Sequence, residues 1–174
     1  MTGTWRISTQ KLTLDKSENL DNSYITTLGG EIKKEKWKFN VEGKAGNSNE
    51  INLGAGYQLN EKSEIYTSVK GDYSKDEVST ETTVGTETKV NKNLKISGEY
   101  REDNTGNEEK KDNILKFDYL LSDNWNISFD YTRSKIDLEK ENNLERNIIG
   151  LGAGYRSDKL RFNNSIEYRK DKGK

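Results

Sequence analysis

The sequence predicts an all-β fold, an antiparallel up-and-down meander of about 10–12 strands. Three observations support this prediction. Apolar and polar residues alternate strictly along many segments, short polar turns separate those segments, and no apolar stripe of helical period is longer than one turn. Strict alternation is typical of strands with one apolar and one wet face. The whole chain, residues 1–174, is expected to form a single domain.

The alternation places the strands in order along the chain. Residues 5–12 are expected to form a first strand, and in residues 125–131 Trp, Ile, Phe and Tyr alternate with Asn, Ser and Asp. The clearest of the other alternating segments are residues 37–42, 94–100, 115–119 and 160–168. The later strands follow one another as five repeated hairpins after the N-terminal strand.

Connections of two kinds join the predicted strands. The tight turns contain only a few polar residues and fall at residues 33–36, 60–62, 91–93, 122–124 and 156–159. Connections that short make neighbouring strands antiparallel. The other connections are longer and more charged, at residues 15–23, 46–50, 74–80, 102–112 and 133–146. One end of the sheet is therefore expected to carry short turns and the other end long loops.

Composition excludes several classes of function. Charged residues make up 34% of the chain and hydrophobic ones only 29%, too few for a conventional two-layer core. The chain has no histidine and no cysteine, which excludes Ser-His-Asp, Cys-His and thiolate–metal sites. We therefore expect no catalytic residue, no cofactor-binding residue and no metal ligand, and the protein is predicted not to be an enzyme. Its net charge of -1 gives no basic footprint for nucleic acid.

The segregated turns and loops, the alternation and the aromatic residues together resemble the bacterial outer-membrane β-barrels, a porin-like family. In that family, two girdles of aromatic residues mark the two interfaces of the bilayer. The residues that match this pattern are Trp37 and Trp125, which open strands at the short-turn end, and Tyr73, Tyr100, Tyr131 and Tyr168, which close strands at the long-loop end. The resemblance implies a transmembrane β-barrel, or part of one, in a bacterial outer membrane, with the lipid bilayer as its partner.

The resemblance also implies that the polar faces of the strands line a lumen. The residues expected there are Lys38, Glu42, Glu64, Lys70, Asp72, Lys95, Glu99, Lys116, Asp118, Asp130, Arg161 and Glu167. One interpretation is a water-filled passage whose selectivity is set by local charge. The other is that opposite charges pair across strands and fill the lumen.

Strand parity and the last residues depart from the family pattern. Family members have an even number of strands and both termini in the periplasm, whereas eleven predicted crossings leave Lys174 on the long-loop side. Residues 169–174 are polar, so the terminal aromatic residue typical of the family is missing. The sequence is therefore expected to be a segment of a larger barrel, completed by further strands of a longer chain or by another copy.

The pentapeptide LGAGY occurs twice, at residues 53–57 and 151–155. Its glycines partly match the GxGxxG fingerprint of nucleotide-binding loops, but neither copy completes the fingerprint and no helix is expected to follow. In both copies Leu, Ala and Tyr share one face of the strand and the glycines share the other. Glycine on an inner face allows sharp curvature or close approach of another segment, so a structural role is predicted.

Two classes of function remain open. The leading hypothesis is a passive outer-membrane barrel, either a porin-like pore or a structural barrel, without catalysis. The alternative is a soluble or cell-surface β-sheet binding protein of the adhesin type, whose apolar face would be a core. The mean hydropathy of -1.09 favours the alternative, whereas the segregation of short turns, Trp and Tyr favours the membrane.

Overall fold

The computed structural model describes residues 2–13, 22–46, 49–73, 78–106, 108–138 and 143–173. In these ranges the chain forms eleven strands, which make one antiparallel sheet in sequence order. The strands are β1 (Thr2–Thr13), β2 (Asn22–Lys34), β3 (Trp37–Ala45), β4 (Asn49–Gln58), β5 (Ser63–Tyr73), β6 (Val78–Lys89), β7 (Leu94–Thr105), β8 (Glu108–Leu120), β9 (Trp125–Leu138), β10 (Leu144–Arg156) and β11 (Arg161–Gly173). The predicted all-β meander is confirmed.

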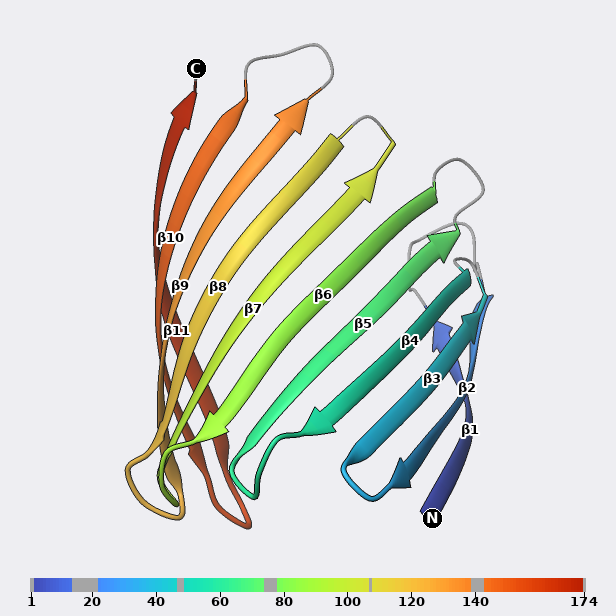
Figure 1. Ribbon diagram of the computed structural model, residues 1–174, viewed down its shortest axis with the longest axis horizontal. Coiled ribbons are helices and arrows are strands. Elements are labelled where there is room, and N and C mark those ends of the chain that lie inside the picture. Colours follow the sequence, from blue (N-terminus) through green and yellow to red (C-terminus); the bar gives the residue numbers. More distant parts are fainter. Residues whose placement is uncertain are drawn as a thin grey trace.

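The sheet is strongly curled (Figure 1). β5–β8 lie in front, while β1–β3 on one side and β9–β11 on the other turn away behind them. Curling of this kind follows from the twist that each strand adds to the next, and it gives the sheet a convex and a concave face. Over the described residues, β1 and β11 are not hydrogen-bonded to each other, so the sheet has two edges. The described part of the chain contains no helix long and apolar enough to cross a membrane.

Side chains at the start of the short turns hold them closed. In the β4–β5 turn, the backbone N–H of Lys62 donates to the Asn60 Oδ1 at 2.8 Å. In the β6–β7 turn, the N–H groups of Asn93 and Leu94 donate to the Asn91 Oδ1 at 2.8 Å and 2.9 Å. Asparagine favours such turns because its side chain hydrogen-bonds to the backbone two residues further on. These turns lie where the sequence predicts them.

Two of the predicted long loops are wrong. Residues 102–112 lie mostly in β7 and β8, and residues 133–146 lie mostly in β9 and β10. The chain turns between β7 and β8 at Gly106, whose φ of 53° is left-handed and suits glycine. The apolar alternation stops before the strands stop, because these extensions carry charged residues on both faces. The pattern therefore underestimates the length of the strands.

Two further predicted loops are shorter than expected. β4 begins at Asn49 and β6 begins at Val78, inside the predicted loops at residues 46–50 and 74–80. The predicted loop at residues 15–23 lies mostly outside the described residues.

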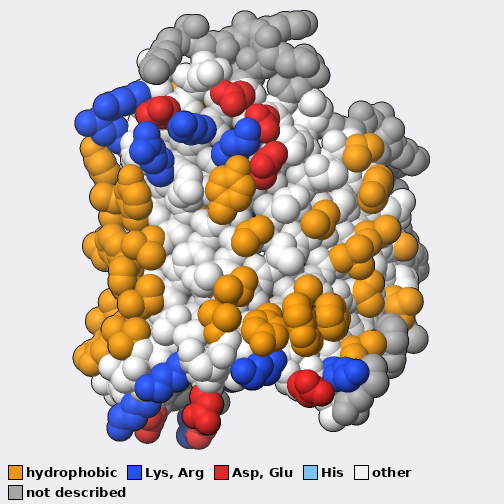
Figure 2. Space-filling model, in the orientation of Figure 1, with side chains coloured by type: hydrophobic (Ala, Val, Ile, Leu, Met, Phe, Trp, Pro, Cys, Tyr) orange, Lys and Arg blue, Asp and Glu red, His pale blue; other side chains and the backbone are white. Residues whose placement is uncertain are grey.

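The convex face carries a broad apolar belt. Directly paired outward residues continue from strand to strand, as in the row Val41, Leu53 and Val69, and they are exposed, with Leu151 at 55% and Ile166 at 72%. Figure 2 shows hydrophobic side chains over the middle of this face and Lys, Arg, Asp and Glu gathered above and below them. An exposed apolar surface of this extent marks a site of contact with a membrane or another protein.

Glycines aside, the buried residues of the described chain lie on the concave face, and most of them are polar. Over the described residues, Ile136 is the one buried large hydrophobic side chain. The buried polar or charged residues are Thr83, Ser97, Asp112 and Ser134. The sheet therefore has no conventional apolar core, which agrees with the low hydrophobic content of the sequence.

Candidate lumen and its charged lining

All of the predicted lumen-lining residues lie on the concave face. Side chains alternate between the two faces of a strand, and the cross-strand register carries each face through the sheet. One concave row, for example, joins Glu87, Ser97, Lys116, Asp130 and Glu167 by direct pairing, with Gly150 between the last two. The other predicted residues occupy equivalent alternate positions: Lys38, Glu42, Glu64, Lys70, Asp72, Lys95, Glu99, Asp118 and Arg161.

Ion pairs connect much of this lining across strands. On β3–β5, the Glu50 carboxylate lies between two lysines, with Lys44 Nζ at 3.1 Å and Lys70 Nζ at 3.4 Å. Lys44 also lies 3.6 Å from Glu42 Oε1. On β2–β3, Glu31 lies between Lys33 and Lys38, at 3.0 Å and 3.2 Å. A carboxylate between two lysines offsets one of their two positive charges.

A second network is centred on Glu99 in the middle of the sheet. Arg101 Nη2 lies 3.2 Å from Glu99 Oε2, and Lys116 Nζ lies 3.6 Å from Glu99 Oε1. The Tyr66 hydroxyl donates to Glu99 Oε1 at 2.8 Å, although β6 separates their strands. Gly85 on β6 makes this contact possible, because a Cβ there would overlap the Tyr66 ring at 2.5 Å from Cζ.

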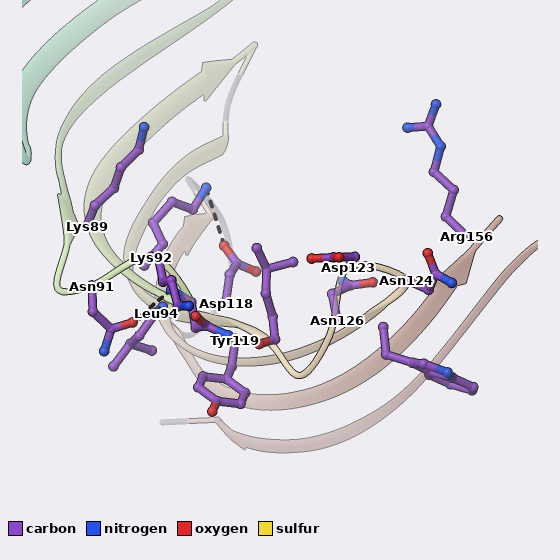
Figure 3. Close-up of a pocket in the computed structure, with 14 residues that line it drawn as sticks. Lys89, Asn91, Lys92, Leu94, Asp118, Tyr119, Asp123, Asn124, Asn126 and Arg156 are labelled. Atoms are coloured by element: carbon purple, nitrogen blue, oxygen red, sulfur yellow. Dashed lines mark hydrogen bonds and ion pairs between the residues drawn. The ribbon is translucent and has the colours of Figure 1, made fainter. Parts of the chain in front are cut away.

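A third network lies beside a cavity at the short-turn end (Figure 3). Lys95 Nζ is 3.4 Å from both Glu87 Oε2 and Asp118 Oδ2. The cavity of about 710 Å³ is bounded by the turns after β6 and β8 and by the end of β10. In Figure 3, Lys89 and Arg156 stand on opposite sides of it. This opening gives water access to the charged lining from the short-turn end.

Inward-facing aliphatic residues on β8–β10 were missed by the sequence analysis. Ile114 and Ile148 flank Thr132 in one concave row, and Ile136 pairs with Leu144 four residues further along. The alternation alone predicts that apolar residues face outward throughout, and only the cross-strand register shows where this pattern breaks. Between these two rows lie Asp112, 4% exposed, and Ser134, 1% exposed. The aliphatic side chains thus shield a polar row from the enclosed space.

The glycines of the two LGAGY segments lie on the concave face, under polar side chains from neighbouring strands. A Cβ at Gly54 would overlap the Asn40 amide, and a Cβ at Gly152 would overlap the Ser128 hydroxyl. A Cβ at Gly154 would meet Asn126 and, at 2.8 Å, the Asn163 Oδ1. The predicted structural role of these glycines therefore has a specific form: each gives room to a polar side chain on the next strand.

The predicted girdle residues lie on the convex face. Trp37 and Trp125 begin β3 and β9 at the short-turn end, and Tyr73 ends β5. Tyr100, Tyr131 and Tyr168 do not close their strands as predicted, because β7, β9 and β11 continue past them into the charged extensions.

Two of these tyrosine hydroxyls reach polar groups on the convex face. The Tyr131 hydroxyl donates to Asn147 Oδ1 at 2.8 Å, and the Tyr100 hydroxyl donates to Glu102 Oε2 at 3.2 Å. A ring over apolar surface with a polar tip among polar groups is the arrangement that tyrosine adopts at an interface between apolar and wet surroundings.

Beyond these tyrosines, the convex face of β7–β9 forms a charged collar of Glu102, Glu109, Lys111, Arg133, Lys135 and Asp137. Lys111 Nζ lies 2.7 Å from Glu109 Oε1. This hydrogen bond lowers the pKa of Glu109 from its usual value and raises the pKa of Lys111. Exposed pairs of this kind contribute little to stability. The collar makes the outer surface polar beyond the apolar belt.

No known protein-family model matches the chain, and no curated protein matches it. Among solved structures, the KdgM porin has 12% identity over 98% of this chain and 96% of its own, with a TM-score of 0.51. The CymD monoaromatic hydrocarbon channel has 12% identity over 97% of this chain and 73% of its own, with a TM-score of 0.55.

The chain shares its fold, a curled antiparallel meander, with these solved porin and channel structures. A second KdgM structure, in complex with disordered oligogalacturonate, aligns with a TM-score of 0.52 at the same 12% identity. At this identity the likeness concerns the fold. The predicted resemblance to outer-membrane β-barrels is confirmed at that level.

Proposed function

We propose that the protein is a porin-like channel of a bacterial outer membrane, which passes solutes passively along its concave face. The observation that carries the proposal is the two-faced curled sheet, with exposed apolar side chains on its convex face and charged side chains on its concave face. In lipid, a spanning structure must satisfy its backbone groups internally, and a curled antiparallel sheet that closes does so. The apolar belt would face the acyl chains, and the Trp and Tyr residues would lie at the two interfaces.

The alternative of a soluble or cell-surface binding protein is less well supported. In such a protein the apolar face would be buried against a second layer, yet in the described residues most of the large apolar side chains of this face are exposed. The charged groups also lie above and below the belt, as two wet interfaces around an apolar slab require (Figure 2).

We further propose that the edges of β1 and β11 are paired in the membrane by additional strands, from a longer chain or another copy. An unpaired backbone group in lipid costs several kcal/mol. Because β1 and β11 run in the same direction, antiparallel closure between them requires an odd number of added strands. The mass of the detergent-solubilised particle tests the source: a single chain per particle would contradict closure by a second copy.

The channel proposal is tested by refolding the protein into detergent and then adding it to a planar lipid bilayer in KCl. We expect stepwise increases in current, each from the insertion of one channel. Strand-rich circular dichroism that appears only with detergent or lipid would support the membrane assignment. A monodisperse, strand-rich monomer in plain buffer would contradict it, and a folded, inserted protein without current would assign a structural role instead.

A further inference from the structure

The hairpins β3–β4 and β9–β10 repeat the same local arrangement. In each, the first Trp pairs directly with the Tyr of LGAGY, Trp37 with Tyr57 and Trp125 with Tyr155. The ring centroids are 4.8 Å and 4.9 Å apart, tilted by 57° and 53°. Because both aromatic pairs lie at the short-turn end, equivalent residues of the two hairpins lie the same number of residues along the strand from that end.

At one pair of equivalent positions, the concave face carries uncharged polar residues on both hairpins. Three residues before the tyrosine, Gly54 pairs with Asn40 and Ser68. The equivalent Gly152 pairs with Ser128 and Ser165. Glycine has no side chain, so the groups that project from these rows are the amide of Asn40 and the hydroxyls of Ser68, Ser128 and Ser165.

The β9–β11 patch is also hollowed. A cavity of about 240 Å³ is lined there by Asn126, Ser128, Gly152, Gly154, Asn163 and Ser165 among others. Asn126 and Asn163 pair with Gly154, two residues nearer the short turns than the row of Ser128. The amide oxygens of both lie beside Gly154. Amides and hydroxyls each offer donors and acceptors, so such a surface can bind a partner that offers both.

The two patches lie on opposite walls of the curled sheet. Five strands, β5–β9, separate β4 from β10 in the sheet order, and Figure 1 shows β3–β4 and β9–β10 on its two sides. The concave side chains of both hairpins therefore point into the same enclosed space.

Many charged residues of the concave face form ion pairs. Glu50 lies between Lys44 and Lys70, and Glu99 lies between Arg101 and Lys116. A solute near this face meets paired charges of both signs and not a row of residues with the same charge. A net charge on the solute therefore strengthens its binding little.

We propose that the two opposed patches, centred on Gly54 and Gly152, form a binding subsite for uncharged, hydroxyl-rich solutes such as neutral oligosaccharides. The inference rests on the proposed channel function and specifies its substrate class. Sugar hydroxyls donate and accept hydrogen bonds, as do Asn40, Asn126 and Asn163, and the glycines give these side chains room along the wall.

The test measures the block of single-channel current by two trisaccharides of equal length, neutral maltotriose and acidic trigalacturonate. We expect maltotriose to bind more tightly. In the double variant Asn126→Leu/Asn163→Leu, which keeps side-chain size, the loss of two hydrogen bonds predicts binding weaker by about 10-fold or more. The KCl conductance should stay within about twofold, because no charge or large volume changes.

Asn113→Leu is the matched control, since Asn113 lies on the convex face of β8, and it should leave the block by maltotriose unchanged. Circular dichroism checks that each variant folds. Tighter block by trigalacturonate, or unchanged block in the double variant, would overturn the proposed subsite while leaving the channel intact.

If the folded protein carries no current, the channel function fails but the subsite is still tested. Saturation-transfer NMR in detergent micelles then measures maltotriose binding directly. Binding that is lost in the double variant supports the subsite, and no binding to the unmodified protein overturns it.

Discussion

At the scale of single residues, the inner glycines decide what the concave face can hold. Gly154 has amides from both neighbouring strands above it, Asn126 and Asn163. We predict that Gly154→Val lowers the free energy of unfolding by about 1–3 kcal/mol, because the added methyl groups overpack against these amides. Ala153→Val, on the exposed convex face of the same strand, is the control and should change stability by less than about 0.5 kcal/mol. Urea unfolding in detergent measures both, and equal effects would contradict the assignment of the faces.

The bridging carboxylate Glu50 is predicted to set the charge balance of its part of the lining. Glu50→Gln leaves Lys44 and Lys70 without their shared partner. We expect the permeability ratio of potassium to chloride to fall by about twofold to fivefold, from the loss of one negative charge close to the ion path. The measurement is the reversal potential in a KCl gradient, with Glu102→Gln on the convex face as the control. An unchanged reversal potential in Glu50→Gln would show that ions do not pass this pair.

At the scale of strands, the extensions of β7–β10 beyond the tyrosine girdle are true β-ladders. Residues 108–112 pair with β7 on one side and with β9 on the other. We predict that their backbone amides exchange slowly with solvent, unlike those of the β4–β5 turn, because ladder hydrogen bonds must open before exchange. Hydrogen exchange followed by mass spectrometry in detergent measures this. If the amides of residues 108–112 exchanged as fast as those of residues 59–62, these residues would form a loop, as the sequence predicts, and not a ladder.

The strands that sequence analysis located well are those with one apolar face. β3 and the first half of β9 show the alternation from Trp37 and Trp125 onward, and the Asn-rich turns mark where strands end. The extensions could not be found in this way, because Glu109, Lys111 and Lys135 make both faces polar. The inward Ile114 and Ile136 were also missed, since a single strand does not reveal which face is concave.

At the scale of the whole molecule, the proposed function depends on the difference between the two faces of the curled sheet. The lining residues could be assigned to one face from the period of two alone. Their ion pairs could not, because pairing depends on cross-strand register: Lys95 meets Glu87 and Asp118 only because β6, β7 and β8 are aligned as they are. The opposition of the two LGAGY hairpins also appears only once the sheet is curled.

The central claim is that the convex face meets lipid while the concave face meets water. The chain has no cysteine, so single cysteines can be placed at consecutive positions of β9 in the protein reconstituted into vesicles. We predict that Ser128→Cys and Asp130→Cys react rapidly with a membrane-impermeant thiol reagent, and that Ile127→Cys and Phe129→Cys react at least about tenfold more slowly, because side chains alternate between the two faces. Equal reactivity at all four positions, or faster reaction at Ile127→Cys and Phe129→Cys, would contradict the account.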